Sequence, residues 1–151
     1  ARAQTNLARY PNVSVIKGDG SAVTFEKADV IYVNAGATRP ADIWLDRLKD
    51  GGRLILPLTT DKGFSSDNWE RMHLRGAVFL IKRKADQFHA RWISPVSIFP
   101  CEGMRDEQSE KALASAFEKG DIKRVTRLYR TADVPADHCW LRAPDWCLAY
   151  D

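Results

Sequence analysis

The sequence predicts an α/β fold, with a mostly parallel sheet that carries an antiparallel hairpin toward its C-terminal end. Residues 12–18 and 28–36 are continuous runs of β-branched and apolar residues, the pattern of strands that are buried on both faces. Residues 28–58 have the pattern of a strand–helix–strand unit, which joins parallel strands by a right-handed crossover. Residues 76–84 and 88–95 are further strand-like runs, and the three residues between them favour a hairpin.

Two helices are predicted in the first half of the chain. Residues 1–9 are good helix formers that end before Pro11, and because no capping residue precedes them we expect the sequence to begin inside a helix. A second helix of about ten residues is predicted after the strand at 28–36, and the strand RLILPL at 53–58 follows it. Its signals are Pro40 near the start, Ile43, Trp44 and Leu48 on one face, Lys49 in the last turn and Gly51 just past the end.

The chain changes character after the hairpin. Residues 105–119 are predicted to form a helix with Leu113 and Phe117 on one face, and Gly120 ends it. Asp121 is predicted to cap a further helix, whose shared face consists of Ile122, Val125, Leu128 and Tyr129. Residues 138–150 contain two short strand-like pieces around Ala143-Pro144-Asp145. The sequence has no internal repeat and no obvious linker, which favours one domain.

The composition is that of a globular domain. With 151 residues, 44% of them hydrophobic, the chain is long enough to bury a sizeable core. The net charge of +3 is ordinary, and apolar residues 77–81 interrupt the basic cluster at 71–84, which favours a strand with solvated flanks over a nucleic-acid patch. No apolar run approaches the roughly 20 residues of a membrane helix, and no signal-peptide pattern is present. We therefore expect a cytoplasmic protein without membrane or nucleic-acid partners.

The residue types that bind metals are scattered along the chain. Cys101, Cys139 and Cys147 lack the close pairs of a structural zinc site, so the sequence predicts reduced thiols and no metal. A disulfide between Cys139 and Cys147, or a site that includes His138, stays open as an alternative. There is no triad and no pair of carboxylates with catalytic spacing, and the catalytic residues are left unassigned.

The stretch Gly18-Asp19-Gly20 follows a predicted strand and has two interpretations. It is not a dinucleotide fingerprint, because Val23 occupies the third glycine position and the next strand follows too soon for a long helix. The simpler interpretation is a turn in which Asp19 caps a helix. In the other, Asp19 accepts a hydrogen bond from the exocyclic amine of an adenine, and the flanking glycines let the flat ring approach the backbone.

An ordered set of motifs resembles one enzyme family. The set comprises the NL before the first strand, the GDG after it, the aspartate that opens the next strand, the small-residue loop beyond it and the block LKDGGRLILP. In this order they resemble the protein-L-isoaspartate O-methyltransferases, which are S-adenosylmethionine-dependent enzymes with a Rossmann-like methyltransferase fold. The resemblance covers residues 1–100, as the C-terminal part of a catalytic domain. Residues 101–151 match less well and are expected to be a helical and β extension packed on the same domain.

The resemblance implies a binding site for S-adenosylmethionine. It places Asp19 and Gly20 at the adenine, with Gly18 allowing the turn. The loop after the next strand would lie at the mouth of the active site, with Asn34, Ala35 and Gly36 at the cofactor and Ala37 and Thr38 at the substrate. Asn34 and Gly36 replace small residues that are usual in the family, a departure that bears on the isoaspartyl substrate and not on the cofactor.

The resemblance also implies parts that these residues lack. A glycine-rich loop for the methionine end of the cofactor, and an acidic residue for the ribose, are expected on strands before residue 1. We therefore expect a truncated sheet with its N-terminal strands missing, a chain that is inactive alone, and exposed edges that pair with the missing part or form a homo-oligomer.

The chemistry implied is methyl transfer to a carboxylate or another nucleophile of a protein or small-molecule acceptor. The cofactor carries the reactivity and a carboxylate is already nucleophilic, so no general base is required. The alternative is a degenerate methyltransferase domain without catalysis, used for binding or assembly.

Overall fold

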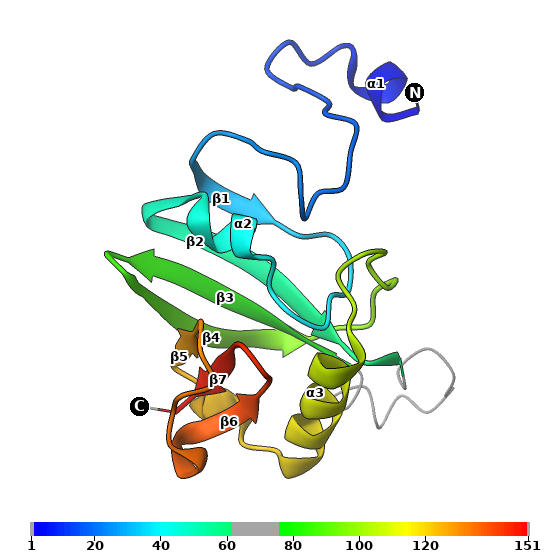
Figure 1. Cartoon of the computed structure of the whole chain (residues 1–151). Coiled ribbons are helices and arrows are strands. Elements are labelled where there is room, and N and C mark those ends of the chain that lie inside the picture. Colours follow the sequence, from blue (N-terminus) through cyan, green and yellow to red (C-terminus); the bar gives the residue numbers. More distant parts are fainter. Residues whose placement is uncertain (1, 62–75, 151) are drawn as a thin grey trace.

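The structure, a computed structural model, describes residues 2–61 and 76–150. In these residues seven strands pair into one mixed sheet. Their order across the sheet is β1-β2-β3-β4-β5-β7-β6 (Figure 1). The strands are β1 (Ala28–Tyr32), β2 (Leu48–Thr59), β3 (Gly76–Lys84), β4 (Gln87–Pro95), β5 (Arg127–Tyr129), β6 (Cys139–Arg142) and β7 (Cys147–Ala149).

Three α-helices and two short 3-10 helices accompany the strands in the described residues. They are α1 (Arg2–Leu7), α2 (Asp42–Asp46), α3 (Glu107–Lys119), η3 (Ile122–Arg124) and η4 (Ala136–His138). The predicted helices at 1–9 and 105–119 are thus confirmed as α1 and α3. The Asp106 side chain caps α3 by accepting a hydrogen bond from the Ser109 backbone N–H at 2.7 Å, and Gly120, with φ of 78°, ends the helix.

The strand–helix–strand unit is confirmed, but its helix is shorter than predicted. β1 and β2 pair in parallel, and α2 lies between them in the chain. α2 has five residues instead of about ten, because Leu48, expected on the helix face, is fully buried at the start of β2 and pairs with Ala28. The register then shifts before Val30 meets Arg53, and Gly51, at φ of 75°, allows the turn that this shift requires.

The hairpin of β3 and β4 is confirmed, but the prediction of a mostly parallel sheet is wrong for the described strands. Only β1–β2 is a parallel pair among them, and every other neighbouring pair is antiparallel. The hairpin lies within the sheet, because β3 pairs with β2 and β4 continues the sheet to β5. The physical reason is the connections: α2 provides a crossover, whereas the tight turn at Ala85 and Asp86 reverses the chain.

The strand predicted at 12–18 is not formed. This segment has no strand assignment, and its apolar side chains Val13 and Ile16 are exposed, Ile16 by 61%. A strand is stable only when a neighbour completes its hydrogen-bond ladder, and no described strand pairs with this segment. The other edge of β1 is also unpaired among the described strands, and Figure 1 shows the connection from α1 looping away from it.

The helix predicted after Asp121 is also wrong. Asp121 has a left-handed backbone and makes no capping hydrogen bond, and only the single turn η3 follows it. The residues beyond form β5, where Leu128 pairs with Phe88 of β4 and with Leu148 of β7. Pairing on both sides outweighs the helical spacing of the apolar residues. The two strand-like pieces at 138–150 are confirmed as β6 and β7.

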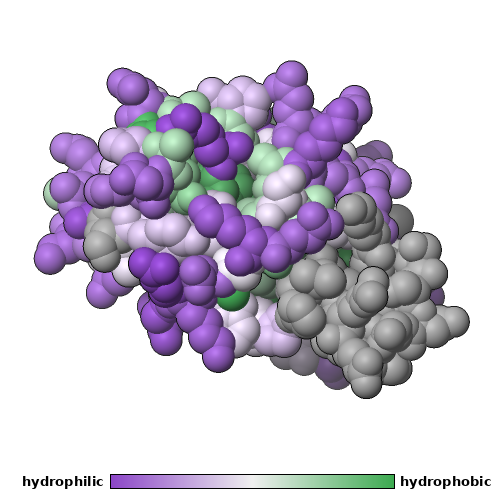
Figure 2. All heavy atoms as spheres, turned by 90° about the horizontal axis from the view of Figure 1, so that it is seen from below, coloured by the Kyte–Doolittle hydropathy of each residue, from purple (hydrophilic) through white to green (hydrophobic). Residues whose placement is uncertain are grey.

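The core joins the sheet to the C-terminal segment. Leu54, Leu56 and Leu58 of β2 point into it, and Phe79 of β3 lies 5.7 Å from Trp140 of β6, measured between ring centroids. Phe117 of α3 packs against the same tryptophan ring at 5.7 Å. The face in Figure 2 is covered mainly by hydrophilic residues, with apolar atoms showing in small areas between them. The buried rings of β3, α3 and β6 therefore join the sheet to the C-terminal segment.

The structure bears on three features noted in the sequence: the basic cluster, membrane helices and the cysteines. Arg71 and Arg75, from the basic cluster at 71–84, lie outside the described residues. No described helix is long and apolar enough to cross a membrane. All three thiols are free, and the Sγ atoms of Cys139 and Cys147 lie 2.7 Å apart in a buried position.

Candidate functional site

The GDG stretch forms a tight turn that is closed by Asp19. Its Oδ1 accepts hydrogen bonds from the backbone N–H of Ser21 at 2.9 Å and from the Ser21 hydroxyl at 2.7 Å. These bonds, the backbone one foremost, lower the pKa of Asp19, so the carboxylate is ionised at neutral pH. A Cβ at Gly18 would lie 2.4 Å from a methyl group of Val23, so a larger residue here would force that side chain to move. The turn is therefore built locally, as the simpler interpretation expects, but the helix that Asp19 was expected to cap is not formed, because residues 23–27 have no regular structure and β1 follows them.

The turn also forms one wall of a cavity of about 620 Å³. Four of the predicted cofactor residues line it, namely Gly18, Asp19, Gly20 and Asn34. Phe25, Ile31 and Trp44 supply apolar and aromatic surface, and the indole N–H of Trp44 donates to the Gly20 carbonyl at 2.8 Å. The charged side chains among the described lining residues are both acidic, Asp19 and Glu102. The volume lies in the usual range of small-molecule sites.

The loop after β1 reaches the cavity at Asn34 and then turns inward. Asn34 is exposed, Ala35 is half-buried and Gly36 is buried. Gly36 packs against Thr59 at the end of β2 so closely that a Cβ would lie 2.2 Å from the Thr59 Oγ1. The glycine at this position, which departs from the family pattern, is therefore explained by packing within this chain.

Ala37 and Thr38, predicted to contact substrate, are fully buried and do not line this cavity. The Ala37 backbone exchanges hydrogen bonds with Pro57 and Thr59. The Thr38 hydroxyl accepts from the Asp106 backbone N–H at 2.9 Å. Their substrate contact stays a prediction, and the contacts present here hold the loop against β2 and α3.

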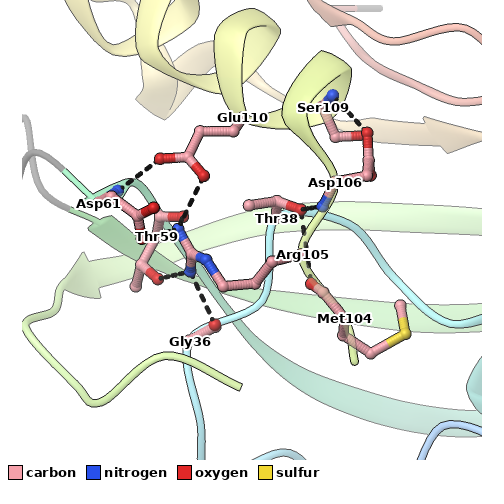
Figure 3. Close-up of polar contacts among 9 residues, drawn as sticks. All are labelled: Gly36, Thr38, Thr59, Asp61, Met104, Arg105, Asp106, Ser109 and Glu110. Carbon is pink, nitrogen blue, oxygen red and sulfur yellow. Dashed lines mark hydrogen bonds and ion pairs between the residues drawn. The ribbon is translucent and has the colours of Figure 1, made fainter. Parts of the chain in front are cut away.

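Arg105 is a polar residue that the sequence reasoning missed; it lines the second cavity described below and holds the loop after β1 from behind. Its guanidinium donates to the Gly36 carbonyl at 3.0 Å and to the Thr59 Oγ1 at 3.1 Å, and it pairs with the carboxylates of Asp61 at 2.7 Å and Glu110 at 3.2 Å. Figure 3 shows the side chain reaching from the start of α3 toward the end of β2. No local pattern signals this role, since Gly36 lies 69 residues away in the sequence.

A second cavity, of about 740 Å³, lies beyond Ser21 and Gly103, which line both cavities. None of the predicted cofactor residues lines it. Its charged lining residues are of both signs, namely Arg39, Asp42, Asp46, Arg47, Arg105 and Asp106. This mixture does not indicate one class of ligand, so the smaller cavity is the candidate site.

The described architecture is a Rossmann-like methyltransferase fold. It matches a solved structure named protein-L-isoaspartate O-methyltransferase with a TM-score of 0.54 and 23% sequence identity, over 87% of this chain and 38% of that one. The sequence model of the protein-L-isoaspartate(D-aspartate) O-methyltransferase family matches residues 1–84, and the chain belongs to this family. The resemblance predicted from the sequence motifs is thus confirmed.

Two curated relatives give the extent of the similarity. The protein-L-isoaspartate O-methyltransferase of Methanothermobacter thermautotrophicus is 32% identical over 102 residues, which cover 59% of this chain and 47% of the relative. That of Pyrococcus abyssi is 35% identical over 105 residues, which cover 67% of this chain and 44% of the relative. The chain therefore spans less than half the length of the relatives it matches.

Proposed function

We propose that this chain forms the adenine side of the active site of an S-adenosylmethionine-dependent methyltransferase. The observation that carries the proposal is the meeting of the GDG turn and Asn34 in one cavity, although they lie on separate segments. Ala35 and Gly36 continue the same loop and complete the predicted cofactor set. Membership of the family supports methyl transfer as the reaction.

The residues present suit this cofactor chemically. S-adenosylmethionine carries a positive sulfonium and a flat adenine, and the cavity offers acidic Asp19 and Glu102 together with the apolar surfaces of Phe25 and Trp44. Ionised Asp19 accepts hydrogen bonds and cannot donate, which matches the exocyclic amine of adenine. When bound, the cofactor supplies the activated methyl group. The residues of this chain bind and orient it and exclude water.

We propose a carboxylate of a protein as the methyl acceptor, since the curated relatives are named for isoaspartate. A carboxylate is nucleophilic at neutral pH and needs no base. This agrees with the absence of histidine and lysine from the described lining residues of the cavity. A small-molecule carboxylate satisfies the same chemistry, and Asn34 and Gly36 are the positions at which acceptor choice is expected to depart from the family.

The rest of the cofactor site is proposed to come from sequence outside these residues. The relatives are more than twice as long as the region matched. The edge of β1 that no described strand occupies, and the exposed side chains of Val13, Ile16 and Tyr32, offer a surface on which further strands can pair and pack. Completion by a second copy of the chain is the competing arrangement. We propose a cytoplasmic location, because three cysteines without the spacing of a disulfide framework are typical of reduced thiols.

Transfer of a radioactive methyl group tests the function. The protein, expressed with any sequence that its gene places before Ala1, is incubated with methyl-labelled S-adenosylmethionine and an isoaspartyl peptide. We expect label on the peptide that is released as methanol at alkaline pH, because a methyl ester is base-labile. The same peptide with ordinary aspartate is the control and should stay unlabelled. Binding of S-adenosylhomocysteine without transfer to any carboxylate acceptor would instead support the non-catalytic alternative.

A further inference from the structure

A segment beyond the family match crosses the loop that follows β1. Residues 99–105, which we call the strap, run parallel to this loop. The Gly36 backbone N–H donates to the Phe99 carbonyl at 2.8 Å, and the Cys101 N–H donates to the Gly36 carbonyl at 2.8 Å. The Thr38 N–H donates to the Met104 carbonyl at 3.0 Å. The strap is thus fixed to the loop by backbone hydrogen bonds at several points.

The strap forms the wall of the cavity that faces the GDG turn. Cys101, Glu102 and Gly103 line the cavity together with Asp19. Gly103 has φ of 86°, and a Cβ there would lie 3.2 Å from the Asp19 Oδ2. The backbone of the strap therefore packs close to this carboxylate, and a side chain at position 103 would be tightly confined. The wall is supplied by residues outside the 1–84 range that the family model matches.

Arg105 holds the end of the strap in place. Its side chain is only 16% exposed, and its charge is balanced by Asp61 and Glu110. It also donates to the Gly36 carbonyl and to both oxygens of Thr59 (Figure 3). Because these acceptors belong to the loop, to β2 and to α3, one side chain fixes the strap to three parts of the fold. Hydrogen bonds to a charged group that is mostly buried are among the stronger ones.

We propose that the strap is a cofactor-binding element, and that Arg105 is the positioning residue that holds it against the nucleoside part of the ligand. This inference rests on the proposed function, since it assigns a second wall to the same site. It goes further in giving the C-terminal extension a direct part in cofactor binding. The cofactor lies between the GDG turn and the strap, and its affinity depends on Arg105.

Cys101 provides a reporter within the strap. It is half-buried, whereas Cys139 and Cys147 are buried in the core, so an alkylating reagent distinguishes them. Burial and the nearby Asp19 charge raise the pKa of Cys101, which makes its reaction slow and sensitive to any opening of the strap. The rate is measured at pH 8 with N-ethylmaleimide, and each cysteine is followed by mass spectrometry of its peptide.

The experiment compares the wild-type protein, as its gene encodes it, with Arg105→Ala, Arg105→Lys and the control Arg124→Ala, whose exposed ion pair lies on η3. We expect Arg105→Ala to raise the Cys101 alkylation rate and to weaken S-adenosylhomocysteine binding, each by at least about tenfold, because hydrogen bonds to a charged group are lost. Arg105→Lys should recover part of both effects, and Arg124→Ala should match the wild type. S-adenosylhomocysteine at saturation should protect Cys101 in the wild-type protein.

The outcomes separate the two proposals. Binding of S-adenosylhomocysteine without protection of Cys101 would overturn the role of the strap and leave the proposed function standing. Absence of binding to the wild-type protein would overturn the proposed function itself. Unchanged alkylation and affinity in Arg105→Ala would overturn the role of Arg105. If Arg105→Ala does not fold, Arg105→Lys and the protection of wild-type Cys101 decide the matter.

Discussion

Phe79→Ala is expected to destabilise the fold by about 3–5 kcal/mol, the cost of deleting a fully buried aromatic ring. Phe79 has no exposed surface, and it packs against Trp140 of the C-terminal segment. We propose that residues 1–100 and 101–151 form one cooperative domain around this contact. Urea unfolding, followed by both tryptophan fluorescence and far-ultraviolet circular dichroism, measures the loss. The two signals should change together in both the wild type and the variant.

Phe99→Ala is the matched control, since it removes the same ring from a position that is 77% exposed. The loss in Phe99→Ala should be smaller than in Phe79→Ala, because a mostly exposed ring buries less apolar surface. Equal losses in the two variants, or separate transitions for the two signals, would mean that the C-terminal segment does not share the core of the sheet.

Gly36→Ala is expected to cost about 1–3 kcal/mol of stability, because the site has no room for a methyl group. The new Cβ would lie 2.2 Å from the Oγ1, 2.9 Å from the Cγ2 and 3.0 Å from the Cβ of Thr59. Thr59→Gly removes all three atoms. The double variant Gly36→Ala/Thr59→Gly should therefore lose less stability than the two single variants lose together. A double-mutant cycle of unfolding free energies measures this coupling.

Gly76 supplies the comparison for this cycle. A Cβ at Gly76 would also meet Thr59, at 2.7 Å from the Cγ2, but it would additionally lie 2.9 Å from the Val96 carbonyl oxygen and 3.0 Å from that of Leu58. Backbone atoms are not removed by a side-chain substitution, so Thr59→Gly should rescue Gly76→Ala much less. Strict additivity of Gly36→Ala with Thr59→Gly would show that the loop after β1 does not pack on β2 as described.

Local patterns in the sequence predicted the elements whose stability is decided locally or by near neighbours. The strands β1 and β2 follow from apolar runs, the β3–β4 hairpin from a short connection, and α3 from its apolar face and Gly120. The meeting of Asp19 and Asn34 followed from the family resemblance, because no spacing rule places two separate segments in one cavity.

The features that the sequence did not predict depend on distant partners. The apolar residues at 13–17 satisfy a strand pattern, yet no described strand lies beside them to complete a ladder. The apolar spacing after Asp121 suits a helix, but Leu128 is flanked by Phe88 and Leu148 of neighbouring strands. The strap and Arg105 act on Gly36 from across the fold, and contacts of that sequence separation leave no local signal.

Calorimetric titration with S-adenosylhomocysteine tests the central claim, that the GDG turn holds the adenine of the cofactor. The protein, with any sequence that its gene places before Ala1, is compared with Asp19→Ala and with Asp29→Ala, an exposed aspartate that lines neither cavity described here. We predict saturable binding to the wild type and to Asp29→Ala, and clearly weaker binding to Asp19→Ala, because the amine of the adenine loses its hydrogen-bond acceptor. Affinity that is unchanged in Asp19→Ala would contradict the assignment of this cavity.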